Sequence, residues 1–358
     1  MAQQVTMQDV AEVAGVSAKT VSNVLRGTGG ASQATREKVL SAVRASGYRL
    51  NTGAAALRSG RHGAIALAVP TLQQPVYAHV AEALMRAAGE VQVVLELTRG
   101  EIDAERALLA GSWRSRCDAL VLAPRGIDPA CEPSSHLLVQ AAGDASRPPA
   151  VVLLADDGPP GVPRVTCPPT AQSLLVAAHL HETSRRRVAV VGARDRADRW
   201  TGACVRALRQ AGLTVPGEAI VRVADVDGLR GGVEAVSRVL YRGARVDAVV
   251  CHNDALASGA AATLMRRGAR VPEDVAVIGR GDTETARYAI PALTSVSVGA
   301  PTAAAAVMRV LAPVLDPAAQ PGPREEGAAP LIEVSPVLTV RASSGPAPPP
   351  ETPASPPP

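Results

Sequence analysis

A short run of polar residues near the N-terminus carries the side chains best suited to chemistry with DNA. Ser17, Lys19, Thr20, Ser22 and Asn23 lie within seven consecutive positions. Hydroxyl, amide and ammonium groups can bond to phosphate oxygens and to the edges of bases in a DNA groove. The run therefore predicts a DNA-reading surface, provided that one element of structure presents these side chains together.

Two short helices joined by a tight turn would position these side chains. Thr6 and Asp9 have the spacing of a capping box, which predicts the start of a first helix. Gly15 can take the left-handed backbone conformation that the corner needs. In the second stretch the apolar residues recur at helical spacing and point inward, which leaves an outward face of Ala18, Lys19, Ser22 and Asn23.

A third amphipathic stretch, from Ser32 to Gly47, completes a domain that we place at residues 1–49. Three helices in about 50 residues make a small core, typical of a DNA-reading module rather than of a catalytic domain. Residues 1–60 contain seven Lys or Arg and three Asp or Glu, a net charge of +4, which equals that of the whole chain. Contact with phosphates explains this concentration of positive charge.

The candidates for catalysis lack the partners that catalysis requires. His252 lies beside Asn253 and Asp254, but no nucleophile and no metal-ligand spacing accompanies it. His179 and His181 are two positions apart on a predicted helix, so they face different directions and cannot share a zinc ion. We expect a protein that is not an enzyme and that binds no metal and no cofactor.

Beyond residue 60 the sequence alternates between apolar strands and amphipathic helices. Short runs rich in Val and Leu, such as Ile65–Val69 and Ala248–Cys251, are separated by stretches of about three helical turns. This alternation predicts parallel sheets covered on both faces. Residues 61–345 exceed one ordinary core, so we expect two lobes, and we expect residues 346–358, rich in proline, to be a disordered tail.

The sequence also bears on where the protein works. We find no secretory signal and no membrane-spanning stretch, so we expect a cytoplasmic protein without a membrane partner. Widely spaced cysteines without a Cys-x-x-Cys pair are typical of reduced thiols, and this chain has five of them, Cys117, Cys131, Cys167, Cys204 and Cys251.

Residues 6–60 resemble the DNA-binding headpiece and hinge of the LacI/GalR family of bacterial transcription regulators. The matching residues form a long ordered set: Val10-Ala11, Ala14-Gly15-Val16-Ser17, Thr20-Val21-Ser22, Val24-Leu25, Thr35-Arg36, Val39, Gly47-Tyr48, Asn51 and Leu57-Arg58-Ser59-Gly60. The resemblance implies an all-α, lambda-repressor-like helix-turn-helix headpiece. It also implies a periplasmic-binding-protein type I fold of two doubly wound lobes, with a ligand cleft between them and three chain crossings. We place the crossings near Pro160–Pro169, Ile290–Ser297 and Gly322–Leu331.

The resemblance assigns roles to individual residues of the headpiece. Ala18, Lys19 and Asn23 fall where the family reads bases in the major groove. The positions where the family holds phosphates are occupied by Thr6, Ser17, Thr20, Ser22 and Ser32.

Residues 50–60 match the hinge of the family, in which Asn51, Leu57 and Arg58 are candidate DNA contacts. Leu57 falls where the family wedges an apolar side chain into the minor groove. Residues 54–58 are too few for a stable isolated helix, so their folding can be coupled to DNA binding. Leu50 stands in place of the usual proline and Gly53 lies within the hinge, so we expect the free hinge to be more flexible than that of the family. A passive linker is the alternative interpretation.

The cleft matches its family less closely. Effector contacts are predicted at Tyr77, Arg199, Asn253 and Asp282. Arg199 begins an Arg-x-x-Gly element, and arginine and asparagine suit small polar ligands. Gly281 stands where an acid often binds sugar hydroxyls, and the usual stacking aromatic near Asp225 is Val226. A sugar, another small metabolite and no effector at all therefore remain open.

These features together predict a sequence-specific transcription regulator, a repressor in the first instance. It would bind a pseudo-palindromic DNA operator as a homodimer, and a small-molecule effector in the cleft would modulate its operator affinity. An activator, or a regulator without a working effector, is the alternative. A cytosolic small-molecule sensor with a non-functional headpiece is an alternative of another class.

Overall fold

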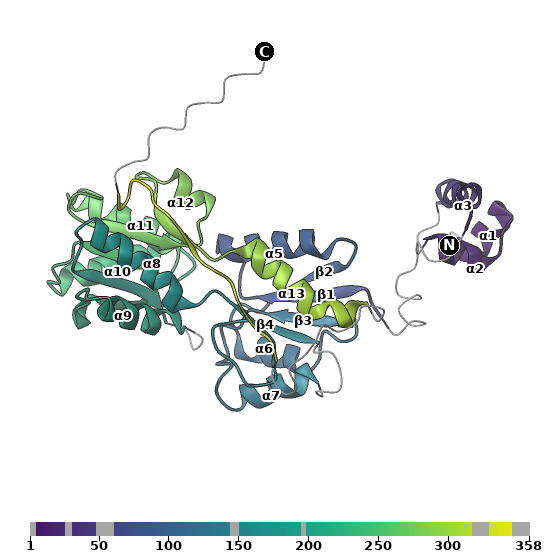
Figure 1. The fold of residues 1–358 in the computed structure, drawn as a ribbon, viewed down its shortest axis with the longest axis horizontal. Coiled ribbons are helices and arrows are strands. Elements are labelled where there is room, and N and C mark those ends of the chain that lie inside the picture. Colours follow the sequence, from purple (N-terminus) through teal and green to yellow (C-terminus); the bar gives the residue numbers. More distant parts are fainter. Residues whose placement is uncertain are drawn as a thin grey trace, which may run out of the picture. The chain divides into compact units, whose positions relative to one another are not determined.

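The computed structural model describes residues 5–25, 31–47, 61–143, 150–194, 198–316 and 329–345. The chain divides into two compact units, Met1–His62 and Gly63–Pro358 (Figure 1). The predicted hinge at 50–60 and the predicted tail at 346–358 lie outside the described residues.

The first unit contains the three predicted helices, α1 (Met7–Ala14), α2 (Ala18–Leu25) and α3 (Gln33–Ser46). Thr6 and Asp9 form the capping box at the start of α1, as their spacing predicts. Gly15 ends α1 with φ of 64°, a left-handed conformation that glycine adopts without strain. The capping and turn residues therefore have the roles that the sequence indicates.

A small apolar core holds these three helices together. Two valines from α2 pack against residues of α1 and α3, and the fully or nearly fully buried members of the cluster are Val10, Ala11, Val21, Val24, Val39 and Ala42. Six small side chains make a core of limited stability, so each of them contributes a large share. Burying these residues leaves the opposite face of α2 to the solvent.

The second unit contains two six-stranded sheets, each at the centre of one lobe. Lobe 1 is the lobe built on the sheet that starts the unit, and its strands pair in parallel throughout. In spatial order they are β11 (Leu331–Glu333), β5 (Arg164–Thr166), β4 (Val151–Leu154), β3 (Ala119–Leu122), β1 (Ala64–Val69) and β2 (Gln92–Leu97).

Helices cover both faces of the lobe 1 sheet. The helices α5 (Pro75–Ala88) and α13 (Ala300–Leu315) lie on one face, and α6 (Ile102–Leu109) and α7 (Ser134–Ala142) on the other. The side chains of β1 alternate accordingly: its three larger residues, from Ile65 to Val69, contact α5 and α13, and its alanines face α6 and α7. Both faces are buried, which is why β1 is apolar throughout.

Lobe 2 repeats this arrangement with an antiparallel edge strand. The strand β12 pairs antiparallel with β10, and the other pairs are parallel. In spatial order the strands are β12 (Val337–Thr339), β10 (Thr294–Ser297), β9 (Ala276–Arg280), β8 (Ala248–Cys251), β6 (Val188–Ala193) and β7 (Ile220–Val223).

The helices of lobe 2 also cover both faces of its sheet. One core contains α10 (Leu229–Tyr241) and α11 (Asp254–Arg266), and the other contains α8 (Pro169–Glu182) and α9 (Trp200–Gln210). A short helix α12 (Glu284–Tyr288) and a 3-10 turn at Gly217–Ala219 complete the lobe. The two doubly wound lobes confirm the fold that the resemblance predicts.

Within the described residues the chain passes between the two sheets three times, but two of the crossings differ from prediction. The first follows β5 and precedes α8, within the predicted segment. The second follows β10, because α13 packs on lobe 1, and so it comes just after the predicted Ile290–Ser297. The third lies between β11 and β12, at residues 334–336, beyond the predicted Gly322–Leu331. The strands β11 and β12, of three residues each, lie at sheet edges, and strands this short carry weak sequence patterns, which explains the shift of the third crossing.

The helix α6 ends at Leu109. Gly111 then takes φ of 97°, and Trp113 turns into the core with 1 % of its surface exposed. No helix within the described ranges is both long and apolar enough to span a membrane.

Candidate DNA-binding and effector sites

The start of α2 presents hydroxyl groups at a helix N-terminus. Ser17 Oγ accepts a hydrogen bond from the Thr20 backbone N–H at 3.1 Å and lies 2.9 Å from Thr20 Oγ1. Both hydroxyls are thereby fixed beside the free N–H groups of the first turn, a site that favours phosphate oxygens. Lys19, in the same turn, is exposed.

The other predicted DNA contacts lie on exposed or half-buried positions of the same unit. Thr6 and Ser32 are exposed. Thr6 caps α1, and Ser32 caps α3 through its Oγ, which accepts a hydrogen bond from the Thr35 N–H at 3.2 Å. The predicted contacts of α2 that are half-buried are Ala18, Thr20, Ser22 and Asn23. Asn51, Leu57 and Arg58 lie outside the described residues, so their roles stay predictions.

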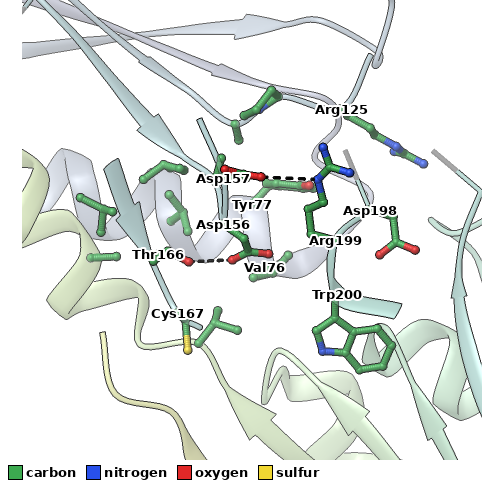
Figure 2. A pocket seen from close by; sticks show the side chains of 18 of the residues that line it. Val76, Tyr77, Arg125, Asp156, Asp157, Thr166, Cys167, Asp198, Arg199 and Trp200 are labelled. Carbon is green, nitrogen blue, oxygen red and sulfur yellow. Dashed lines mark hydrogen bonds and ion pairs between the residues drawn. The ribbon is translucent and has the colours of Figure 1, made fainter. Parts of the chain in front are cut away.

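A cavity of about 200 Å³ lies between the lobes of the second unit. Lobe 1 contributes the start of α5 and the segments after β3, β4 and β5, whereas lobe 2 contributes the segments before α9 and after β8 and the end of β9. The carboxyl ends of parallel strands from both sheets thus meet at this cavity, where doubly wound folds bind ligands. Figure 2 shows Asp156 and Asp157 across the cavity from Trp200 and Asp198.

Arg199 reaches across the cleft from lobe 2 to lobe 1. Its Nη2 lies 2.6 and 2.5 Å from the two carboxylate oxygens of Asp128, and its Nε lies 4.0 Å from Asp157. Burial raises the pKa of Asp128, but hydrogen bonds from Cys131 and Ala130 and the Arg199 charge together hold that pKa below its ordinary value. The predicted effector residue therefore has a carboxylate partner from the opposite lobe.

A second ion pair also joins the lobes, but here the arginine belongs to lobe 1 and the carboxylate to lobe 2. Arg125, after β3 of lobe 1, places Nη1 2.9 Å from both oxygens of Asp227, which precedes α10 of lobe 2. The Gln74 amide of lobe 1 also donates to Asp227. Both charged side chains are largely buried, with 16 % of Arg125 and 23 % of Asp227 exposed. Two ion pairs formed by the chain's own residues thus bridge the cleft.

His252, which follows β8, is neutral in this environment. Burial first, and then the charge of Arg280, lowers the pKa of His252 to about 4. Its Nδ1 is buried without a hydrogen-bond partner and lies 3.8 Å from Asp198. The Trp200 ring meets the imidazole edge to face, with centroids 5.3 Å apart. Within the described ranges no three His, Cys, Asp or Glu side chains are placed to hold a metal ion.

The four predicted effector contacts do not share one cavity. Tyr77 and Arg199 line the cavity between the lobes. Asn253 lines an adjoining hollow of about 110 Å³, and both ends of its amide are bonded: Oδ1 accepts from the Leu256 N–H and Nδ2 donates to the Val226 carbonyl.

Asp282 lines another hollow, of about 250 Å³. Its carboxylate accepts from Arg341 Nη2 at 2.6 Å and from Thr339 Oγ1 at 3.1 Å, and so it secures the last strand of lobe 2. The structure therefore brings Tyr77 and Arg199 together and places Asn253 and Asp282 in neighbouring hollows.

Sequence reasoning overlooked several residues that the structure places in the cleft. Asp156 and Asp157 lie two and three residues after the end of the apolar strand β4, so the rule that sites form at strand ends was a sufficient signal for them. Arg280, at the end of β9, gave the same signal. Asp128 and Asp227 lie in loops, and their partners are 71 and 102 residues away, so nothing local marks them.

Known proteins share both units of this chain. Residues 6–51 match the family described as bacterial regulatory proteins, lacI family, and residues 177–344 match the periplasmic binding protein-like domain. The transcriptional regulator AscG of Escherichia coli (strain K12) is 33 % identical over 303 residues, which cover 82 % of this chain and 87 % of AscG.

Solved structures agree with these matches. The structure of a putative LacI-family regulator from Sanguibacter keddieii DSM 10542 is 33 % identical, with a TM-score of 0.65 over 80 % of this chain and 100 % of that one. The Lac repressor dimer bound to operator and the anti-inducer ONPF has a TM-score of 0.77 at 22 % identity, over 96 % of this chain and 99 % of that one, and so shares the fold.

The chain belongs to the LacI family of bacterial regulatory proteins. It is a DNA-binding transcription regulator with a helix-turn-helix headpiece and a two-lobed, periplasmic-binding-protein-like effector domain.

Proposed function

We propose that this protein is a cytoplasmic repressor without enzymatic activity that binds a pseudo-palindromic operator as a homodimer. Each headpiece would insert the N-terminal part of α2 into a major groove, and a twofold dimer would read two half-sites. A small polar effector in the cleft between the lobes would change operator affinity. The start of α2 is the single observation that carries the proposal.

At that start, exposed Lys19 adjoins two hydroxyls held in place by the cap. Lys19 and Asn23 are positioned for base edges, and Ser17 and Thr20 for phosphates. A fixed hydroxyl loses little conformational entropy on contact with DNA, so the cap favours binding.

The cleft supplies the means of control. Arg199 and Tyr77 line it from opposite lobes, so a ligand that contacts both would change the balance between closed and open arrangements. Operator affinity would then change by the difference in ligand affinity between the two arrangements. Asn253 and Asp282 would support the surrounding framework through the hydrogen bonds they already make.

The operator can be found by selecting genomic fragments bound by the purified full-length chain at physiological salt. On the selected site, Lys19→Ala should weaken binding about 5- to 150-fold, the value of one good base contact of about 1–3 kcal/mol. Lys38→Ala, which removes the same charge from an exposed position of α3, is the matched control and should have a smaller effect. Equal affinities of Lys19→Ala and the unchanged chain would contradict the assignment of α2 as the reading helix.

A regulator without an effector is the second candidate. It is favoured by the two ion pairs, since they close the cleft with the chain's own residues. In that case Arg199→Ala would alter operator affinity with no small molecule added. A variant whose affinity changes only in response to added compounds would support the effector-controlled repressor instead.

A further inference from the structure

The charges that line the cleft cavity differ in how fully they are already paired. Arg199 is paired with Asp128, and Arg125 with Asp227. Asp198 accepts from the backbone N–H and the hydroxyl of Thr201 and is almost fully buried. The charged atoms of these side chains therefore already have binding partners within the protein.

Asp156 and Arg280 are the exceptions on the two sides of the cavity. Asp156 Oδ1 accepts a hydrogen bond of 2.6 Å from Thr166, and within the described ranges no cation forms an ion pair with this carboxylate. Arg280 donates through Nε to Gln172 at 2.7 Å, and no described carboxylate forms an ion pair with its guanidinium. Both residues line the same cavity, one from each lobe.

The two groups influence one another without contact. Burial raises the pKa of Asp156, and the positive charge of Arg280 acts in the opposite direction. A half-buried carboxylate without a cation is unfavourable, so a donor or ammonium group placed beside Asp156 would be stabilised. Asp157, next along the chain, adds a second carboxylate at the same end of the cavity (Figure 2); it is half exposed and lies 3.9 Å from Arg164 and 4.0 Å from Arg199, so of the two Asp156 is the carboxylate that no described cation pairs with.

A third side of the cavity is apolar. Val76 and Val80 of α5, with Ala303 of α13 and Val334, line it together with Val298. The aromatic surface is small: Trp200 is only 4 % exposed, so its ring faces offer little area to a ligand, and Tyr77 is the other Tyr or Trp among the lining residues. A sugar would find few stacking faces here, whereas an aliphatic group would find a matching wall.

From this arrangement we infer that the cleft binds a small zwitterion with an aliphatic body, of which an aliphatic α-amino acid is the simplest example. Its ammonium group would lie at Asp156 and Asp157, its carboxylate at Arg280, and its side chain against the valines. The inference rests on the proposed function, because it takes the cleft as the effector site. A cavity of about 200 Å³ has the volume of about seven waters, which suits a molecule of this size.

The test uses the full-length protein with L-leucine, L-valine, L-isoleucine and L-methionine as probes, in thermal unfolding and calorimetry. At one hundred times its Kd, a ligand that binds here should raise the unfolding temperature by about 5–10 °C. Isoamylamine and 4-methylpentanoate, which each lack one charge of leucine, should give much smaller shifts. Cellobiose, an uncharged sugar, is the comparison that tests whether the cleft binds sugars instead.

Variants separate the site from general stability effects. Asp156→Asn should weaken amino-acid binding about 10- to 100-fold, since it removes one charge-assisted interaction. Arg280→Gln should weaken it similarly and gives an independent test if one variant folds poorly. Asp103→Asn, at a fully exposed side chain of lobe 1, is the control and should bind as the unchanged chain does.

The outcomes distinguish this inference from the proposed function. If none of the four amino acids binds, or if cellobiose binds and Asp156→Asn leaves amino-acid binding unchanged, the zwitterion inference is overturned. If cellobiose also releases operator DNA, the effector-controlled repressor stands while the ligand class fails. If an amino acid binds through Asp156 but leaves operator affinity unchanged, the ligand class stands and the proposed control fails.

Discussion

Removing the ion pair between Arg125 and Asp227 should shift the effector domain toward an open cleft. The change we consider is Asp227→Asn, which keeps the size of the side chain and removes its charge. Arg125→Gln and the double variant complete a cycle that isolates the interaction between the two side chains. This pair connects lobe 1 to lobe 2, so its loss should favour separation of the lobes.

The geometry sets the expected magnitude. With Nη1 2.9 Å from both carboxylate oxygens, the charge centres are about 4 Å apart, which corresponds to about 4 kcal/mol at an effective dielectric constant of about 20. Desolvation of two largely buried groups and the ordering of two side chains oppose this attraction. A net coupling of about 1–3 kcal/mol remains, which would change the ratio of open to closed molecules about 5- to 150-fold.

Single-molecule energy transfer between the lobes can measure that ratio. Dyes at Asp103→Cys and Tyr241→Cys would report on lobe 1 and lobe 2, because both positions are well exposed. Exposed Cys131 must be replaced by serine, which retains a donor toward Asp128 and so spares the other ion pair.

The matched control is Asp274→Asn. It breaks an exposed ion pair with Arg270 that lies wholly within lobe 2, so the open fraction should not change. If Asp227→Asn leaves the open fraction unchanged, and the cycle yields a coupling below about 0.5 kcal/mol, the pair does not hold the lobes together.

Three further predictions concern stability. Gly259→Ala should destabilise lobe 2 by several kcal/mol, because a Cβ at this position would lie 2.0 Å from the Leu229 carbonyl oxygen where α10 and α11 pack together. Urea unfolding measures this, and an unaltered urea midpoint would show that these helices can separate freely. Val21→Ala should cost the headpiece about 2 kcal/mol and lower its unfolding temperature in calorimetry more than Val13→Ala, since Val21 is fully buried and Val13 is 66 % exposed; equal effects would contradict the assigned core. The free energy of unfolding of the effector domain should fall as the pH decreases from 6.5 toward 4, because His252 takes up a proton in the unfolded chain there while the buried imidazole, with its pKa of about 4, does not. His252→Gln should flatten this dependence, and a variant with the same pH profile as the unchanged chain would refute the role of His252.

Much of the headpiece follows from local sequence. The capping box at Thr6, the corner at Gly15 and the buried positions of α2 depend on residues within a few positions of one another. The alternation of apolar strands and amphipathic helices likewise reflects the period of each element. Such patterns are visible in one sequence because the interactions that produce them act along the local chain.

The crossings between lobes and the residues of the cleft depended on tertiary structure. Arg199 could be selected from its motif, but its pairing with Asp128, 71 residues away, results from the way the two sheets face one another. Asn253 and Asp282 have suitable chemistry, yet their polar groups cap a helix and hold an edge strand. Whether a polar side chain serves a ligand or its own fold depends on which donors and acceptors the folded chain brings within about 3 Å, and no local pattern encodes that distance.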